Sequence, residues 1–184
     1  MPDAQRDSSN GRIFWTAAVL VVVLDVATKL LAERYLALHV PHPVLGDFAR
    51  LTLAYNPGAA FSMHLGPYSR YIFGAFAAVA LVILWRLYRH TARRDVPRVL
   101  ALGLACGGAA GNLIDRFRSS AGVVDFIDIG VGDVRFWTFN VADSAVTVGA
   151  ILLAMVLWQE DRVAARRARA ETRRAPAAEE RRGT

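Results

Sequence analysis

Two aspartates at the edges of apolar segments are the residues of this chain best suited to chemistry. Asp143 stands at the start of the last long apolar run, and Asp125 lies in a β-branched, apolar stretch before it. A charged side chain in a membrane-spanning segment is costly, so a functional role is the first hypothesis. Two carboxylates held within a few Å cannot both ionise easily, and one then keeps its proton. Such a pair can activate a water molecule for attack on an amide carbonyl.

The spacing of Asn140 and Asp143 predicts which of the two carboxylates is charged. Asn140, with Asp143 three residues later, resembles a capping box, in which each side chain bonds the other residue's backbone N–H. The dipole of the helix that follows would favour the ionised form of Asp143. Asp125, on an expected strand near the bilayer surface, lacks that help. We therefore predict that Asp143 is the more acidic member and that Asp125 more often carries the proton.

A serine–lysine hydrolase is the chemical alternative, because the chain contains Lys29 together with Ser144 and Ser62. Asp25 precedes Lys29 by four residues, so the two side chains share one helix face and can pair. That pairing would keep Lys29 charged, which argues against its acting as a base. Whether the pair is purely structural or also belongs to the site stays open at this point.

The remaining polar and nucleophilic residues are interpreted as structural. Cys106 lies about 9 Å of helix rise deeper than Asn112 and is expected to be a small core residue. In a regular strand Asp128 points to the opposite face from Asp125, and Asp133 falls in a turn. The four histidines lack the spacing of metal ligands, so no metal site is expected.

Hydropathy divides the chain into four apolar segments that we expect to be membrane-spanning helices. The 184 residues are 54% hydrophobic yet carry a formal net charge of +6, a combination typical of membrane proteins with basic cytoplasmic ends. The expected spans cover residues 13–32, 70–88, 96–114 and 141–158. A signal peptide is the alternative for the first segment, but no small-residue cleavage site follows it.

Two segments outside the spans have the character of β-structure. Leu51, Leu53 and Tyr55 alternate with other residues, which predicts a short half-buried strand. Residues 123–129 and 134–139 flank a glycine-containing turn and predict a β-hairpin. The expected fold class is an all-α polytopic membrane protein with four transmembrane helices, a small extracytoplasmic β-element and both termini in the cytoplasm.

The distribution of arginine orients the four helices. Five arginines cluster in and around the connection between the second and third spans: Arg86, Arg89, Arg93, Arg94 and Arg98. Because both termini are also basic, the positive-inside rule places this connection and the termini in the cytoplasm. The extracytoplasmic loops are then 33–69 and 115–140. The expected parts are a disordered cytoplasmic N-terminus (1–12), a transmembrane catalytic domain (13–158) and an Arg-rich cytoplasmic tail (159–184).

The tail contains eight arginines and five acidic residues. A solvated helix whose basic face contacts anionic lipid is the simplest interpretation. Nucleic-acid binding is not expected.

The polar residues of the spans fall at one depth. A rise of about 1.5 Å per residue puts Asp25, Lys29, Asn112 and Asp115 in the outer half of a ~30 Å hydrocarbon core. Asp143 opens the fourth span at the same side. A proton-coupled carrier would distribute ionisable groups through the whole depth, and a purely structural protein would gain nothing from them. One reactive site at the outer level is therefore favoured.

Five short motifs occur in order along the chain. The motifs are Asp25-Val26-Ala27-Thr28-Lys29, Asn56-Pro57-Gly58-Ala59-Ala60-Phe61-Ser62, Gly107-Gly108-Ala109-Ala110-Gly111-Asn112-Leu113-Ile114-Asp115-Arg116, Val123-Val124-Asp125-Phe126 and Phe139-Asn140-Val141-Ala142-Asp143-Ser144. Each is weak alone, but five at these spacings are specific. Together they resemble the bacterial lipoprotein signal peptidase family, the type II signal peptidases.

The resemblance implies an intramembrane aspartic endopeptidase. Its substrates would be diacylglyceryl-modified prolipoproteins, cut on the N-terminal side of the lipidated cysteine, with Asp125 and Asp143 as the catalytic pair. The positions implied to bind substrate or support the site are Asn56, Asn112, Arg116, Asn140, Asp25 and Lys29. No metal or organic cofactor is implied, and partners besides the substrates are membrane lipids. We expect a monomer in the bacterial cytoplasmic (inner) membrane, with its active site at the extracytoplasmic face.

Overall fold

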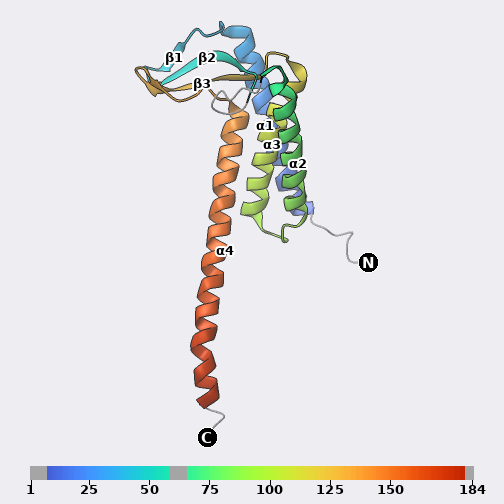
Figure 1. Ribbon diagram of the computed structural model, residues 1–184, viewed down its shortest axis with the longest axis vertical. Coiled ribbons are helices and arrows are strands. Elements are labelled where there is room, and N and C mark those ends of the chain that lie inside the picture. The colour runs from blue at the N-terminus through green and yellow to red at the C-terminus, as the bar shows by residue number, and fades with distance from the viewer. Residues whose placement is uncertain (1–7, 59–65, 181–184) are drawn as a thin grey trace.

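Four long helices make up most of the described chain. The computed structural model describes residues 8–58 and 66–180, in which the helices form a bundle with a small sheet at one end (Figure 1). The helices are α1 (Ser8–Tyr35), α2 (Ser69–Arg89), α3 (Val96–Arg118) and α4 (Val141–Glu180), and a short 3-10 helix, η2 (Gly66–Tyr68), leads into α2. Each long helix is long and apolar enough to cross a membrane, as the prediction of four membrane-spanning helices requires.

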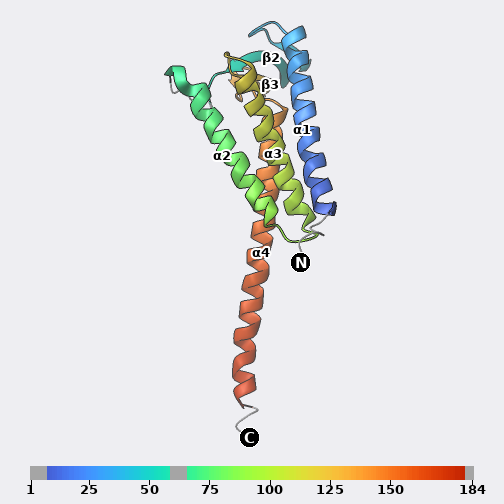
Figure 2. The same cartoon turned by 90° about the vertical axis from the view of Figure 1, so that its right-hand side faces the viewer.

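The third helix, α3, lies at the centre of the bundle and packs against α1, α2 and α4. It begins at Asp95, whose side chain accepts a hydrogen bond from the backbone N–H of Arg98, as expected of a helix N-cap. Figure 2 shows α2 leaning away from α1 and α3 toward the sheet end of the bundle. The centre of the bundle near the other end is a cluster of Phe14, Val99 and Leu102.

The sheet joins the two segments that lie between helices at this end. Its four antiparallel strands are in the order β1 (His42–Leu45), β2 (Ala49–Asn56), β3 (Val123–Val131) and β4 (Val134–Arg135). The predicted strand around Leu53 and the predicted hairpin after residue 123 are confirmed. The pairing of β2 with β3 and the strand β1 were not predicted from the sequence. In this register Ala54 lies opposite Asp125.

A second apolar cluster fastens the sheet to the bundle. Leu53 of β2 and Val124 and Phe126 of β3 pack on Ala32 near the end of α1. Val124 and Phe126 alternate with Asp125, so the strand buries its apolar face on α1 while the aspartate points to the other face. The sheet thereby fixes the position of Asp125 relative to the helices.

Two helices are longer than predicted. α1 begins at Ser8, so residues 8–12 are helical, which corrects the prediction of a disordered N-terminus over that part. α4 continues through the Arg-rich tail as far as Glu180. The tail is rich in Ala, Arg and Glu, which have good helix propensity, so its polarity alone did not mark the end of α4. The side of the membrane on which the termini lie stays a prediction.

The end of α3 also differs from its predicted position. The helix continues to Arg118, which places Asp115 and Arg116 on α3 instead of in the predicted outer loop 115–140. Asp115 and Arg118 are three residues apart and form an ion pair (3.4 Å), one reason why the charged residues extend the helix.

Gly107 allows α1 and α3 to approach closely. A Cβ atom at this position would lie 2.7 Å from the backbone oxygen of Ala18 and 2.8 Å from the Cβ of Val21. At Gly74 on α2 the nearest atoms to such a Cβ would be 3.9 Å away, an ordinary contact distance. Gly107 is thus a helical position with no room for a Cβ atom, and Gly74 is a helical position with room for one.

We predict that Gly107→Ala lowers the melting temperature of the detergent-solubilised protein, because α1 and α3 must separate to admit the methyl group. Overpacking of this kind costs roughly 1–3 kcal/mol. Gly74→Ala, the control, is expected to leave the melting temperature unchanged or slightly raised, since alanine is the better helix former. Equal melting temperatures for the two variants would contradict the packing argument.

Candidate active site

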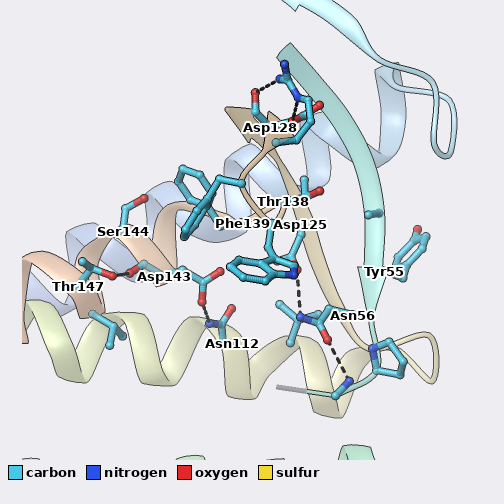
Figure 3. A pocket seen from close by; sticks show the side chains of 18 of the residues that line it. Tyr55, Asn56, Asn112, Asp125, Asp128, Thr138, Phe139, Asp143, Ser144 and Thr147 are labelled. Carbon is cyan, nitrogen blue, oxygen red and sulfur yellow. Dashed lines mark hydrogen bonds and ion pairs between the residues drawn. The ribbon is translucent and has the colours of Figure 1, made fainter. Parts of the chain in front are cut away.

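A cavity of ≈ 1200 Å³ lies between the sheet and the neighbouring ends of α3 and α4. The residues that line it come from β2, β3, the segment 135–139 and the first two turns of α4, with Asn112 and Arg116 from α3. Both predicted aspartates face it: Asp125 from the sheet and Asp143 from the start of α4 (Figure 3). The fold therefore brings together two carboxylates that lie eighteen residues apart in the sequence.

The predicted capping box is present at the start of α4. The backbone N–H of Asp143 donates to Asn140 Oδ1 (2.9 Å), and the backbone N–H of Asn140 donates to Asp143 Oδ2 (3.2 Å). The side-chain amide of Asn140 also donates to Asp125 Oδ1 (2.8 Å). Asn140 is fully buried and bonds both aspartates, so a single residue sets how the two carboxylates lie relative to each other.

Two further asparagines hold the other oxygens of the pair. Asn112 donates to Asp143 Oδ1 (2.7 Å), and its own Oδ1 accepts from Asn140 (3.1 Å). Asn56, at the end of β2, donates to Asp125 Oδ2 (3.3 Å). Each carboxylate is therefore bound by amide groups on both oxygens, while both aspartates still line the cavity (Figure 3).

The surroundings of Asp125 raise the pKa of its carboxyl group to about 7. Burial is the largest cause, and the nearby charge of Asp143 adds to it. The hydrogen bonds from Asn56 and Asn140 act in the opposite direction, because they stabilise the ionised form. This direction agrees with the prediction that Asp125 is the member of the pair that carries a proton.

Lys29 lies behind the cavity with no exposed surface and is held by three partners. Its ammonium group pairs with Asp25 (2.7 Å) and Asp115 (2.8 Å) and donates to Asn112 Oδ1 (2.9 Å). An ammonium group has three N–H donors, so all of them are used. The predicted pairing with Asp25 is confirmed, and the bond to Asn112 connects this pair to a residue that lines the cavity.

The two carboxylates around Lys29 bind the backbone next to the aspartate pair. Asp25 accepts a hydrogen bond from the backbone N–H of Ala142 (2.9 Å), the residue before Asp143. Asp115 accepts one from the backbone N–H of Val124 (3.1 Å), the residue before Asp125. Asp115 was not among the predicted site residues. Its position three residues after Asn112, on the same helix face, was the available signal.

Arg116 brings a cation to the edge of the cavity. It donates to the backbone oxygens of Asn112 (3.0 Å) and Gly58 (2.8 Å). Its Nε is buried and has no hydrogen-bond partner among the described residues. Arg116 therefore connects α3 with the segment that follows β2.

The alternative nucleophiles lie in different places. The hydroxyl of Ser144 lines the cavity but donates to the backbone oxygen of Asn140 (3.0 Å). Cys106 packs against the Phe14–Val99–Leu102 cluster, as predicted for a small core residue. Ser62 lies outside the described residues.

Other residues around the cavity serve the sheet. Asp128 binds Arg135 (2.7 Å) and Thr52 (3.1 Å), which confirms its structural interpretation, although it also lines the cavity. Asp133 lies in the turn between β3 and β4, as predicted. The aromatic wall formed by Phe136, Trp137 and Phe139 was not predicted as part of the site.

Fold and site together define a polytopic membrane protein with a buried pair of carboxylates near one end of its bundle. A family model described as signal peptidase (SPase) II matches residues 17–159. The chain therefore belongs to the signal peptidase II family, multi-pass proteases of bacterial membranes.

Individual relatives agree with this assignment. The lipoprotein signal peptidase of Desulforapulum autotrophicum is 46% identical over 141 residues, which cover 73% of this chain and 85% of the relative. That of Pseudomonas syringae pv. tomato is 39% identical over 164 residues, covering 86% and 94%. A solved structure of a bacterial membrane enzyme superimposes with a TM-score of 0.72 at 31% identity and covers 79% of this chain and 87% of its own.

We predict that Lys29→Met lowers the free energy of unfolding by roughly 3–5 kcal/mol, because removal of one partner leaves buried carboxylates uncompensated. The control is Arg50→Met, which removes a partly exposed cation that pairs with Asp47. That loss is expected to cost about 0–1 kcal/mol. Denaturant or thermal unfolding in detergent measures both, and a comparable loss in the two variants would contradict the role assigned to Lys29.

Proposed function

We propose that this protein is an intramembrane aspartic endopeptidase that removes the signal peptide of diacylglyceryl-modified prolipoproteins. The cut would fall on the N-terminal side of the lipidated cysteine. Family membership and the names of the relatives, lipoprotein signal peptidase, support the substrate class. The observation that carries the mechanism is the position of Asn140, which bonds a carboxylate at a helix N-terminus and a buried carboxylate on a strand.

In the proposed reaction the two aspartates take different parts. Ionised Asp143 removes a proton from a water molecule, whose oxygen attacks the carbonyl carbon of the scissile amide. Protonated Asp125 donates to the carbonyl oxygen as negative charge develops there. The tetrahedral intermediate then breaks at the C–N bond, and the proton held by Asp143 passes to the leaving amine. Asn56, Asn112 and Asn140 keep the carboxylates in place through these steps.

Three contacts argue against the serine–lysine alternative. Every N–H donor of Lys29 has an acceptor, and two of these acceptors are carboxylates that favour the charged amine. A charged, fully bonded lysine has no lone pair with which to activate Ser144.

Arg116 is the cation better placed to contact the substrate, because it lines the cavity between α3 and the segment that follows β2.

The proposed location is the bacterial cytoplasmic membrane with both termini in the cytoplasm and the cavity at the extracytoplasmic face. The five arginines at the end of α2, the start of α3 and the connection between them support this orientation. A single chain supplies both aspartates and the asparagines that bind them, which supports a monomer as the working unit.

We predict that Asp125→Asn and Asp143→Asn each lower cleavage of a diacylated prolipoprotein by roughly 10²–10⁴-fold, the usual contribution of acid–base groups. Cys106→Ala and Ser144→Ala are the controls and should retain cleavage, with all variants first checked for folding. An intact substrate after incubation with the unmodified protein would disprove the protease assignment. Full cleavage by either aspartate variant would disprove the pair and favour the serine–lysine mechanism.

The pKa of Asp125 predicts an upper pH limit for cleavage. Because the carboxyl keeps its proton up to about pH 7, activity that needs protonated Asp125 should be lost as the pH rises through about 7. In Asn56→Ala a donor to the ionised carboxylate is removed, so the pKa of Asp125 rises further and the loss should move to higher pH. Thr138→Ala, another change in the cavity wall, should not move it. A pH profile identical in all three proteins would refute this assignment of the proton.

A further inference from the structure

The end of the bundle away from the sheet carries two tryptophan–arginine pairs of the same construction. On α2 the guanidinium of Arg89 lies 5.7 Å from the centroid of the Trp85 ring, and on α4 that of Arg162 lies 4.7 Å from the Trp158 ring. In both pairs the arginine follows the tryptophan by four residues, about one helical turn, and lies farther from the sheet. Both arginines are exposed. Each pair is a cation–π contact, in which the Trp158 ring is exposed and the Trp85 ring is half-buried against the core cluster of the bundle.

An ion pair holds the second of these pairs level with the start of α3. Arg98, in the first turn of α3, binds Glu160 of α4 (2.5 Å). Glu160 lies midway between Trp158 and Arg162 in the sequence, so these two residues lie level with the start of α3 along the bundle. Figure 1 shows that α4 passes beyond the ends of α2 and α3 at this level. The two pairs therefore lie at the same end of the bundle, on different helices.

Positive charge at this end exceeds the neighbouring negative charge. Within segments 86–98 and 158–168 the arginines are Arg86, Arg89, Arg93, Arg94, Arg98, Arg162, Arg166 and Arg167, and the acidic residues are Asp95, Glu160 and Asp161. Arg98 pairs with two of these three carboxylates, Asp95 and Glu160. The arginines of these two segments outnumber the acidic residues by eight to three, so this end can attract anions.

We propose that this end of the bundle binds the headgroups of anionic phospholipids in the inner leaflet, with Trp85–Arg89 and Trp158–Arg162 as two contact points. The proposal rests on the orientation given under the proposed function, which puts this end at the cytoplasmic surface. Tryptophan rings prefer the level of the headgroups, and an arginine one turn farther out can bind a phosphate through two parallel N–H bonds. The match to the family model ends at residue 159, so Arg162 lies outside the part shared with that model.

The apolar surface beside the arginines favours lipid over nucleic acid. Leu157 and Val163, the neighbours of Trp158 and Arg162 in the sequence, are each 47% exposed. Acyl chains and the carbonyl region of a bilayer can cover such side chains, whereas a nucleic acid offers phosphate without that cover. The charges further along α4 would then strengthen the attraction to an anionic surface.

The test uses the full-length protein reconstituted into vesicles of phosphatidylcholine with phosphatidylglycerol as a minor component. The protein is re-extracted in mild detergent, and mass spectrometry measures the ratio of the two lipids that remain bound. The double variant Arg89→Gln/Arg162→Gln, called the inner-end variant, removes the arginine of both proposed contact points. The matched control, called the outer-end control, is Arg34→Gln/Arg70→Gln. It removes two arginines that stack on Tyr35 and Tyr71 at the other end of the bundle.

We expect the unmodified protein and the outer-end control to retain phosphatidylglycerol in preference to phosphatidylcholine. The inner-end variant should lose this preference by roughly five-fold for each arginine removed. Equal losses in the two double variants, or a preference unchanged by the inner-end changes, would overturn the proposal. So would the absence of a preference in the unmodified protein, or displacement of the bound lipid by an RNA oligonucleotide.

The lipid ratio is measured without any cleavage, so it is independent of the proposed protease activity. Protease accessibility of the C-terminus in sealed vesicles tests the orientation on its own. A protein that retains phosphatidylglycerol but leaves prolipoprotein intact would defeat the proposed function and uphold the lipid site.

Discussion

The buried ammonium group of Lys29 is the contact on which the geometry of the site depends. It pairs with Asp25 from its own helix and with Asp115 from α3, and all three side chains are buried. Charges taken out of water are stable only when they are fully paired and bonded. Each carboxylate also accepts a hydrogen bond from a backbone N–H: Asp25 from Ala142 at the start of α4, and Asp115 from Val124 at the start of β3. One cation thus ties together α1, α3, α4 and the sheet.

These contacts restrict the movement of β3 and α4, the two elements that carry the aspartates, relative to each other. Val124 and Ala142 directly precede Asp125 and Asp143, so the backbone is fixed one residue away from each carboxylate. Asn112 then connects Lys29 to the side chain of Asp143. A site that must hold two carboxyl groups close together needs such support, because the ionised forms of both would repel each other.

The small residues of α3 leave room for this polar cluster and also allow the helices to pack closely. A Cβ atom at Gly111 would lie 2.5 Å from Oδ2 of Asp25, the oxygen that pairs with Lys29. Glycine at this position therefore leaves the space in which the ion pair sits. The sequence indicated close helix approach from the density of glycine in this span, but it did not indicate that a carboxylate from another helix would occupy the space.

Local patterns predicted most of the fold, and long-range pairing accounts for most of what they missed. Four apolar runs, the capping box at Asn140 and the i, i+4 pair of Asp25 and Lys29 depend on neighbours in the sequence, so they were predictable. The pairing of β2 with β3 joins segments about seventy residues apart, and no local pattern specifies it. The role of Asp115 was missed for the same reason, since both of its buried partners lie on other elements.

The pairing of β2 with β3 also contributes to the raised pKa of Asp125. A helix N-terminus can favour an ionised Asp143 from local sequence alone. The raised pKa of Asp125 has a different origin, because burial is its largest cause and the burial comes from the sheet. Strand β2 covers Asp125 from the side of Ala54 and supplies Asn56, whose hydrogen bond limits the rise. The raised pKa of Asp125 thus depends on its burial beside a strand from a distant part of the chain and on the nearby charge of Asp143. The proposed aspartic mechanism depends on this difference between the two carboxylates.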